Sequence, residues 1–266
     1  MSFWQSVLAF LDTSMKTPEP YGWFHLVWFA LSFLAIIPLV KFAKNPRKVI
    51  LITAVVVTVL EIYKQINYSF SYEIGILFDY QWYAFPFQFC STPMYVGLLA
   101  GLVKPGKLQQ RLYAYLATYA LFAGLSVMVY PVSVFISTVG INLQTMFCHG
   151  SMITVGVYLL CTGAVKPERK TLWKAVPVFA VCLVLAVGMN ELAHASGLLQ
   201  RETFNMFFVS PYCEPSLPVY SLVQGAVAYP WCLVLYIFGF TVASGLVLLA
   251  AMGIVKLTQK KQANPV

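Results

Sequence analysis

The sequence is poor in charge. Only 10% of its 266 residues are Asp, Glu, Lys or Arg, whereas 60% are hydrophobic and the mean hydropathy is +0.76. A soluble domain of this size carries about 25% charged residues. The composition therefore excludes a soluble globular domain and predicts one membrane domain over residues 1–266, all-α and polytopic.

Several other features are missing as well. The start of the chain has no basic region followed by a small-residue cleavage site, so we expect no signal peptide. Five of the six cysteines fall in apolar runs, without a CxxC pair and without His and Cys at zinc spacing. We therefore expect no disulfide framework, no metal and no cofactor.

Hydropathy divides the chain into seven apolar segments, each comparable to the roughly 20 residues that span a bilayer. Residues 1–20 contain apolar side chains at helical spacing, which predicts a short interfacial helix. Residues 21–255 form the predicted seven-helix bundle, and 256–266 a basic tail. The predicted spans are Tyr21–Val40, Val49–Tyr68, Tyr83–Leu102, Leu112–Tyr130, Ile141–Gly163, Ala175–Glu191 and Ala226–Val255.

Four basic segments fix the orientation. They are residues 41–48, 104–111 and 166–174 and the tail from Lys256, and together they hold 14 of the 17 Lys and Arg residues. All four lie on one side only if the number of spans is odd. The positive-inside rule then predicts an N-terminus outside and a C-terminus in the cytoplasm. The net charge of +8 thus reflects topology and anionic lipids rather than a nucleic-acid partner.

The second predicted span contains two charged residues, Glu61 and Lys64. Charges inside a span cost roughly 2.5–3.5 kcal/mol each and usually serve a function. The two are three residues apart, so they share a helix face and can form an ion pair. A structural pair that fixes helix packing is nearly as good an interpretation as a catalytic one.

Two further spans contain reactive side chains. The third holds Cys90 between Pro86 and Pro93, and the fifth holds His149 on one face with Asn142 and Thr145. Alone, a buried cysteine is usually an inert packing residue and a single histidine a hydrogen-bonded one. Both, however, lie about 10–12 Å below the outer face at roughly 1.5 Å per residue.

Cysteine with histidine is the pairing that covalent acyl transfer requires. The imidazole takes the thiol proton, and the thiolate attacks an ester to give an acyl thioester. Glu61, Asn142 and Asn190 are candidates for orienting the imidazole. Gln88, Lys64 and backbone N–H groups freed by proline are candidate oxyanion donors. The segment from His194 to Gln224 is long enough to fold over such a site as a lid.

At these residues the chain resembles the YwaF-like family of integral membrane proteins, which includes the eukaryotic transmembrane-protein-164 phospholipid acyltransferase. The likeness spans most of the chain. Many relatives carry His where this chain has Gln88, so a second imidazole is absent here. The matching features are Glu61 with Lys64, the Pro-x-x-x-Cys of Pro86 to Cys90, His149, the segment TFNMFFVSPYCEP with Asn205, and AYPWCLVLY.

The resemblance implies that Cys90 is a nucleophile and His149 its base, in transfer of fatty acyl chains between phospholipids and lysophospholipids. Distantly related seven-span lipid hydrolases leave hydrolysis of a lipid ester open. The expected location is a bacterial-type plasma membrane.

A transporter and a ligand-binding membrane protein without chemistry are the alternatives from other classes. Transport is disfavoured because the polar residues gather in one half of the membrane and no spans show inverted-repeat similarity. A retinal protein is excluded because the seventh predicted span contains no lysine.

Overall fold

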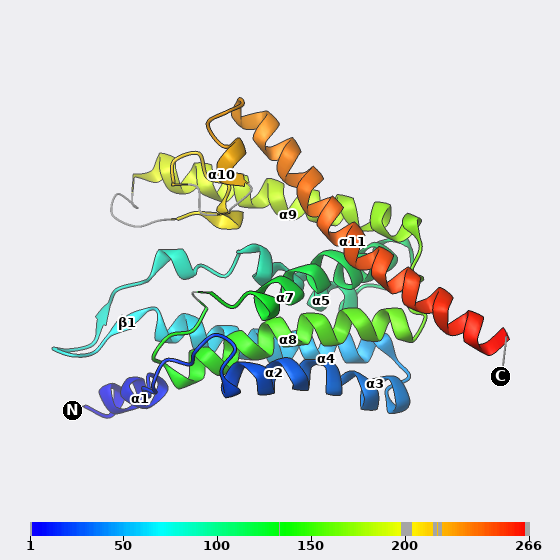
Figure 1. The fold of residues 1–266 in the computed structure, drawn as a ribbon. Helices are drawn as coiled ribbons and strands as arrows, with labels where there is room; N and C mark the ends of the chain where they lie inside the picture. Colours follow the sequence, from blue (N-terminus) through cyan, green and yellow to red (C-terminus); the bar gives the residue numbers. More distant parts are fainter. Residues whose placement is uncertain (1, 133, 198–203, 215–216, 218–219, 264–266) are drawn as a thin grey trace.

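The computed structural model describes residues 2–132, 134–197, 204–214, 217 and 220–263. Its helices lie alongside one another, as the composition predicts (Figure 1). In chain order the elements are α1 (Phe3–Leu11), α2 (Trp23–Leu34), α3 (Ile36–Phe42), α4 (Pro46–Asn67), β1 (Phe70–Ser71), β2 (Leu77–Phe78), η1 (Trp82–Ala84), η2 (Phe89–Ser91), α5 (Thr92–Leu102), α6 (Lys107–Tyr115), η3 (Leu116–Ala120), α7 (Leu121–Val129), α8 (Val139–Cys161), α9 (Arg169–Ser196), η4 (Met206–Phe208), α10 (Tyr220–Val223) and α11 (Tyr229–Ala263).

Six helical segments within the described residues are long and apolar enough to cross a membrane. Each overlaps one of the predicted spans. A further apolar helix, Phe89–Leu102, is shorter than the roughly 20 residues that a span needs. Length and composition thus support six spans, and the seventh stays a prediction. The six segments are Trp23–Phe42, Pro46–Asn67, Lys107–Val129, Val139–Cys161, Arg169–Ser196 and Tyr229–Ile254.

The predicted third span is a regular α-helix only in its second half. Before Thr92 the chain makes two short 3-10 turns, η1 and η2, instead of continuing the expected helix from Tyr83. Pro86 has no N–H to give to a helix and disfavours helical geometry in the residue before it. Pro93 is tolerated because it falls in the first turn of α5, where a backbone N–H is not needed.

Helix α5 runs antiparallel to α4 and in close contact with it. A Cβ on Gly97 would lie 3.0 Å from the Cβ of Ala54, so the two helices approach closely because this residue has no side chain. At the other end of α5 the Arg47 guanidinium donates to the carbonyls of Gly101 (2.6 Å) and Leu102 (2.9 Å). The end of α5 therefore meets the beginning of α4.

The basic segments gather at one end of the bundle. The end of α8 joins the same level, because the Tyr158 hydroxyl donates to the carbonyl of Ala43 at 2.7 Å. Near the beginning of α9, the Leu172 side chain lies 3.2 Å from the position of a Cβ on Gly245 of α11. Figure 1 shows the C-terminus toward this basic end and the N-terminus, β1 and α10 toward the opposite end.

The predicted short N-terminal helix is confirmed as α1. It is held against the bundle by its last turn: the Tyr63 hydroxyl donates to the carbonyl of Leu11 at 2.6 Å. The Asp12 carboxylate accepts from the hydroxyls of Tyr72 (2.9 Å) and Thr138 (2.8 Å). These bonds join α1 to the β1 hairpin and to the beginning of α8; its position at a membrane interface stays a prediction.

Candidate functional site

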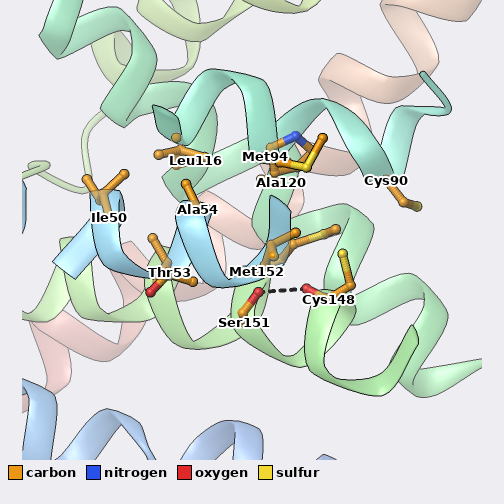
Figure 2. Close-up of a pocket in the computed structure, with 14 residues that line it drawn as sticks. Ile50, Thr53, Ala54, Cys90, Met94, Leu116, Ala120, Cys148, Ser151 and Met152 are labelled. Carbon is orange, nitrogen blue, oxygen red and sulfur yellow. Dashed lines mark hydrogen bonds between the residues drawn. The ribbon is translucent and has the colours of Figure 1, made fainter. Parts of the chain in front are cut away.

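A narrow apolar slot runs between α4, α5, η3 and α8. Figure 2 shows Cys90 and Cys148 toward one end of it and Ile50 and Leu116 toward the other. Its free volume is about 30 Å³, close to the space of one water molecule. The slot therefore has thiols at one end and mainly apolar side chains, with the Thr53 hydroxyl, at the other.

Cys90 lies in η2, immediately before α5, and is half-buried. The backbone around it is closed into a turn, because the N–H groups of Ser91 and Thr92 donate to the carbonyl of Gln88 at 2.8 and 3.3 Å. The sequence predicted backbone N–H groups freed by proline here, but the N–H groups of Ser91 and Thr92 are hydrogen-bonded within the turn that leads into α5. The thiol projects from this turn beside the slot (Figure 2).

Sequence reasoning missed Cys148. This residue is buried on α8 and lines the same slot as Cys90 (Figure 2). Its carbonyl accepts from the hydroxyl of Ser151 at 2.8 Å. The only signal for Cys148 in the sequence was its position next to His149, which gives both residues nearly the same predicted depth in the membrane.

His149 is half-buried on α8, and its ring has a defined orientation. The Nδ1 atom lies 2.7 Å from the carbonyl oxygen of Thr145. A carbonyl only accepts, so Nδ1 carries the proton in the neutral ring and Nε2 carries the lone pair. Among the described residues, no hydrogen bond joins Nε2 to another group or Cys90 to His149. The ring therefore presents a free base.

Glu61 and Lys64 form the predicted ion pair, at 2.8 Å. The two Glu61 carboxylate oxygens also accept from the side-chain amides of Gln65 (2.8 Å) and Gln144 (3.0 Å). The carboxylate is buried and has these three partners, so it links α4 to α8. This arrangement supports the packing interpretation of Glu61 and leaves it no contact with the His149 ring.

The same network reaches the loop after β2. The Tyr80 hydroxyl donates to the Gln65 side-chain carbonyl at 2.5 Å, and the Gln65 amide also donates to the carbonyl of Ala84 at 2.9 Å. Burial, with a smaller contribution from the Glu61 carboxylate, raises the pKa of Tyr80 to about 12. The hydroxyl thus stays protonated at neutral pH and remains a donor.

Lys64 connects this network to the slot. Its ammonium pairs with Glu61 of the same helix, and Glu61 is bonded through Gln144 to α8, which lines the slot. An ammonium has three donors, and one of them is accounted for by Glu61. Lys64 therefore keeps donors for a further partner, whereas the Gln88 amide is bonded to Asn205 and Phe207.

Gln88 and Asn190 hold the segment around η4 from two sides. The Gln88 amide donates to the carbonyl of Asn205 and accepts from the N–H of Phe207, both at 2.9 Å. The Asn190 amide donates to the carbonyl of Met206 at 3.0 Å and accepts from its N–H at 2.8 Å. We call this arrangement of Gln88, Asn190 and residues 205–210 the clamp.

The clamp holds an unfavourable backbone in place. Phe207 and Phe208 both have positive φ values (60° and 56°), a conformation that costs about 1–2 kcal/mol per residue outside glycine. The side chain of Asn205 accepts from the N–H of Ser210 at 2.9 Å, and the Tyr236 hydroxyl donates to the carbonyl of Phe207 at 2.9 Å. The expected lid thus includes a buried, strained turn; the part of it over residues 198–203, 215–216 and 218–219 lies outside the described residues.

Asn142 has a local structural contact. Its amide donates to the carbonyl of Ile136 at 2.7 Å and accepts from the N–H of the same residue at 3.0 Å. It therefore holds the segment before α8 and does not touch the His149 ring. Of the three candidates for orienting that ring, each is bonded elsewhere, and the Thr145 carbonyl holds Nδ1 instead.

The described residues contain no group of three His, Cys, Asp or Glu side chains that could hold a metal ion. The model of the TMEM164 family matches residues 19–253, which is nearly the whole chain. The chain belongs to the TMEM164 family. No curated protein and no solved structure matches it. With its apolar helices, membership of this membrane-protein family identifies an integral membrane protein.

Proposed function

We propose that the protein is a membrane-embedded acyltransferase that moves fatty acyl chains from phospholipids to lysophospholipids through a thioester on Cys90. One observation carries the proposal: Cys90 stands at the end of an apolar slot that is also lined by α4 and α8, the helices of Lys64 and His149. A polar group beside an apolar channel is what a lipid ester requires. The basic end faces the cytoplasm of a bacterial-type plasma membrane.

In the first half-reaction, His149 Nε2 takes the proton of the Cys90 thiol as the sulfur attacks the ester carbonyl of the donor. Desolvation in the apolar slot disfavours a free thiolate, so the proton leaves during attack. Lys64 donates to the oxyanion of the tetrahedral intermediate. The carbon–oxygen bond then breaks, and the departing lysophospholipid oxygen receives the proton from His149.

The second half-reaction reverses these steps with a new acceptor. His149 Nε2 takes the proton of the acceptor lysophospholipid hydroxyl, whose oxygen attacks the thioester carbonyl. The carbon–sulfur bond breaks, and the sulfur of Cys90 recovers the proton. If water replaces the acceptor, the product is a free fatty acid and the protein is a lipid-ester hydrolase.

The test uses purified protein in vesicles with a phospholipid carrying a labelled acyl chain and an unlabelled lysophospholipid. We expect label in the acceptor, and loss of transfer by about 10³-fold or more in Cys90→Ala with an unchanged unfolding temperature. Label in free fatty acid alone would favour hydrolysis. Full transfer by Cys90→Ala would refute the proposed nucleophile, and solute flux abolished by Glu61→Gln would favour a transporter.

A further inference from the structure

A second cavity lies against the slot, on the other side of the contact between α4 and α8. Its volume is about 350 Å³, and it is bounded by α2, α3, α4 and α8. Three residues line both spaces: Thr53 of α4, with Ser151 and Val155 of α8. These side chains therefore lie between the two spaces.

The slot alone is too short for a membrane-lipid acyl chain. Along α5 it extends from Cys90 to Gly97, seven residues or about 10 Å. An acyl chain covers half of the hydrocarbon core, which is about 15 Å. A chain that is attached at Cys90 and enters the slot must therefore continue beyond it, and the second cavity is the adjoining space.

The walls of the second cavity suit an apolar occupant. Its two buried hydroxyls are engaged with the backbone: Ser32 donates to the carbonyl of Trp28 at 2.8 Å, and Thr154 to the carbonyl of Ser32 at 2.7 Å. Leu31 at its edge is 47% exposed, and Leu39 lies at its basic end. Hydrocarbon can thus fill the cavity without leaving these two buried hydroxyls unpaired.

The slot wall contains side chains that can adapt to an occupant. Two of its lining residues, Met94 and Met152, have flexible side chains that adapt to irregular partners. Leu116 and Ala120, at the two ends of the π-helical turn η3, form the opposite wall. Turns of this kind occur mostly as single-turn bulges inside α-helices and are frequent at functional sites.

We propose that the fatty acyl chain carried on Cys90 runs along the slot and ends in the second cavity, which therefore sets the preferred chain length. The inference rests on the proposed acyl transfer and adds the residues that select the substrate. Val155 and Thr53 are the passage between the two spaces, and Leu39 is the far wall.

Two substitutions with opposite effects test this assignment. Val155→Phe narrows the passage, whereas Leu39→Ala lengthens the cavity. Each variant is assayed in vesicles with a competing mixture of donors that carry short, medium and long acyl chains, and the products are resolved by mass spectrometry. Val184→Phe is the matched control, because Val184 of α9 is 69% exposed and lies outside both spaces.

We expect Val155→Phe to lower the ratio of kcat/KM for long over short chains by about tenfold or more, and Leu39→Ala to raise it. The control should keep the wild-type ratio. If Val155→Phe does not fold, Leu39→Ala carries the test alone. Unchanged ratios with transfer intact would overturn the inference and assign the cavity to a tail of a neighbouring lipid. Absence of transfer by the wild-type protein would instead contradict the proposed function.

Discussion

The clamp and the Cys90 end of the slot are both polar regions within an apolar bundle, but their polar groups are satisfied to different degrees. In the clamp, the amides of Gln88 and Asn190 each donate and accept one hydrogen bond. At this end of the slot, no hydrogen bond of the described residues engages Cys90 Sγ, and none engages Nε2 of His149, which follows the slot-lining Cys148 on α8 but does not itself line the slot. Buried polar groups are normally hydrogen-bonded, so the clamp has a structural role and the slot is the region available for chemistry.

Substitution of His149 has the largest expected effect on acyl transfer relative to its effect on stability, and so distinguishes the slot most clearly from the clamp. His149→Gln removes the base, so we expect acyl transfer to fall by about 10²–10⁴-fold while the unfolding temperature stays near that of wild type. Transfer assays in vesicles and thermal unfolding measure the two effects. The matched control is His194→Gln, because this exposed histidine stacks on Tyr212 outside the slot. Equal losses in both variants would remove the distinction.

Substitution of Glu61 tests whether the Glu61–Lys64 pair has a structural role, as the clamp has. Glu61→Gln leaves the Lys64 ammonium without its charge partner, and breaking a buried pair in this way costs about 3–5 kcal/mol of unfolding free energy. The double variant Glu61→Gln with Lys64→Met removes the unpaired charge, so it should be more stable than the single variant. If the two substitutions simply add in chemical denaturation, the pair does not stabilise the fold.

Substitutions in the clamp should lower the free energy of unfolding more than they lower the rate of acyl transfer. Asn190→Ala leaves the Met206 N–H unpaired, at a cost of about 1–3 kcal/mol, and leaves its carbonyl with only the long bond from the Val209 N–H at 3.5 Å. Transfer per folded molecule should change much less than in His149→Gln. Gln110→Ala, an exposed truncation on α6, should cost under about 0.5 kcal/mol. A catalytic loss without a stability loss in Asn190→Ala would contradict the structural role of the clamp.

Substitution of Cys148 has the smallest expected effect and distinguishes between the two thiols of the slot. Cys148→Ala removes the second thiol of the slot with a small loss of volume, so turnover should fall by less than about tenfold. The rate of acyl transfer, compared side by side with Cys90→Ala, measures the difference. A loss as large as that of Cys90→Ala would assign the nucleophile to α8.

The membrane class and the Glu61–Lys64 pair could be predicted from the sequence because they depend on composition and on helical spacing, and the family could be predicted from the likeness of several short motifs. Cys90 lines the slot together with Cys148, the residue before His149, and the common depth of Cys90 and His149 stays a prediction. The late beginning of α5 followed from Pro86, which hydropathy does not register. Hydropathy and helical spacing do not predict short 3-10 turns such as η1 and η2.

The contacts of Gln88, Asn142 and Asn190 could not be predicted, because their partners are backbone groups of distant turns. The Gln88 amide bonds residues more than a hundred positions later in the chain. The orienting group for His149 was also missed, since any helix supplies a carbonyl four residues earlier. Cys148 had no pattern of its own to distinguish it from the other apolar cysteines.

The most direct test of the central claim is to trap the acyl enzyme. Wild-type protein is incubated with a donor phospholipid in the absence of acceptor, digested, and mapped by mass spectrometry with and without hydroxylamine. The account predicts an acyl group on Cys90 that hydroxylamine removes and that Cys90→Ala does not form. An adduct on Cys148, or transfer that proceeds with no adduct on any cysteine, would contradict it.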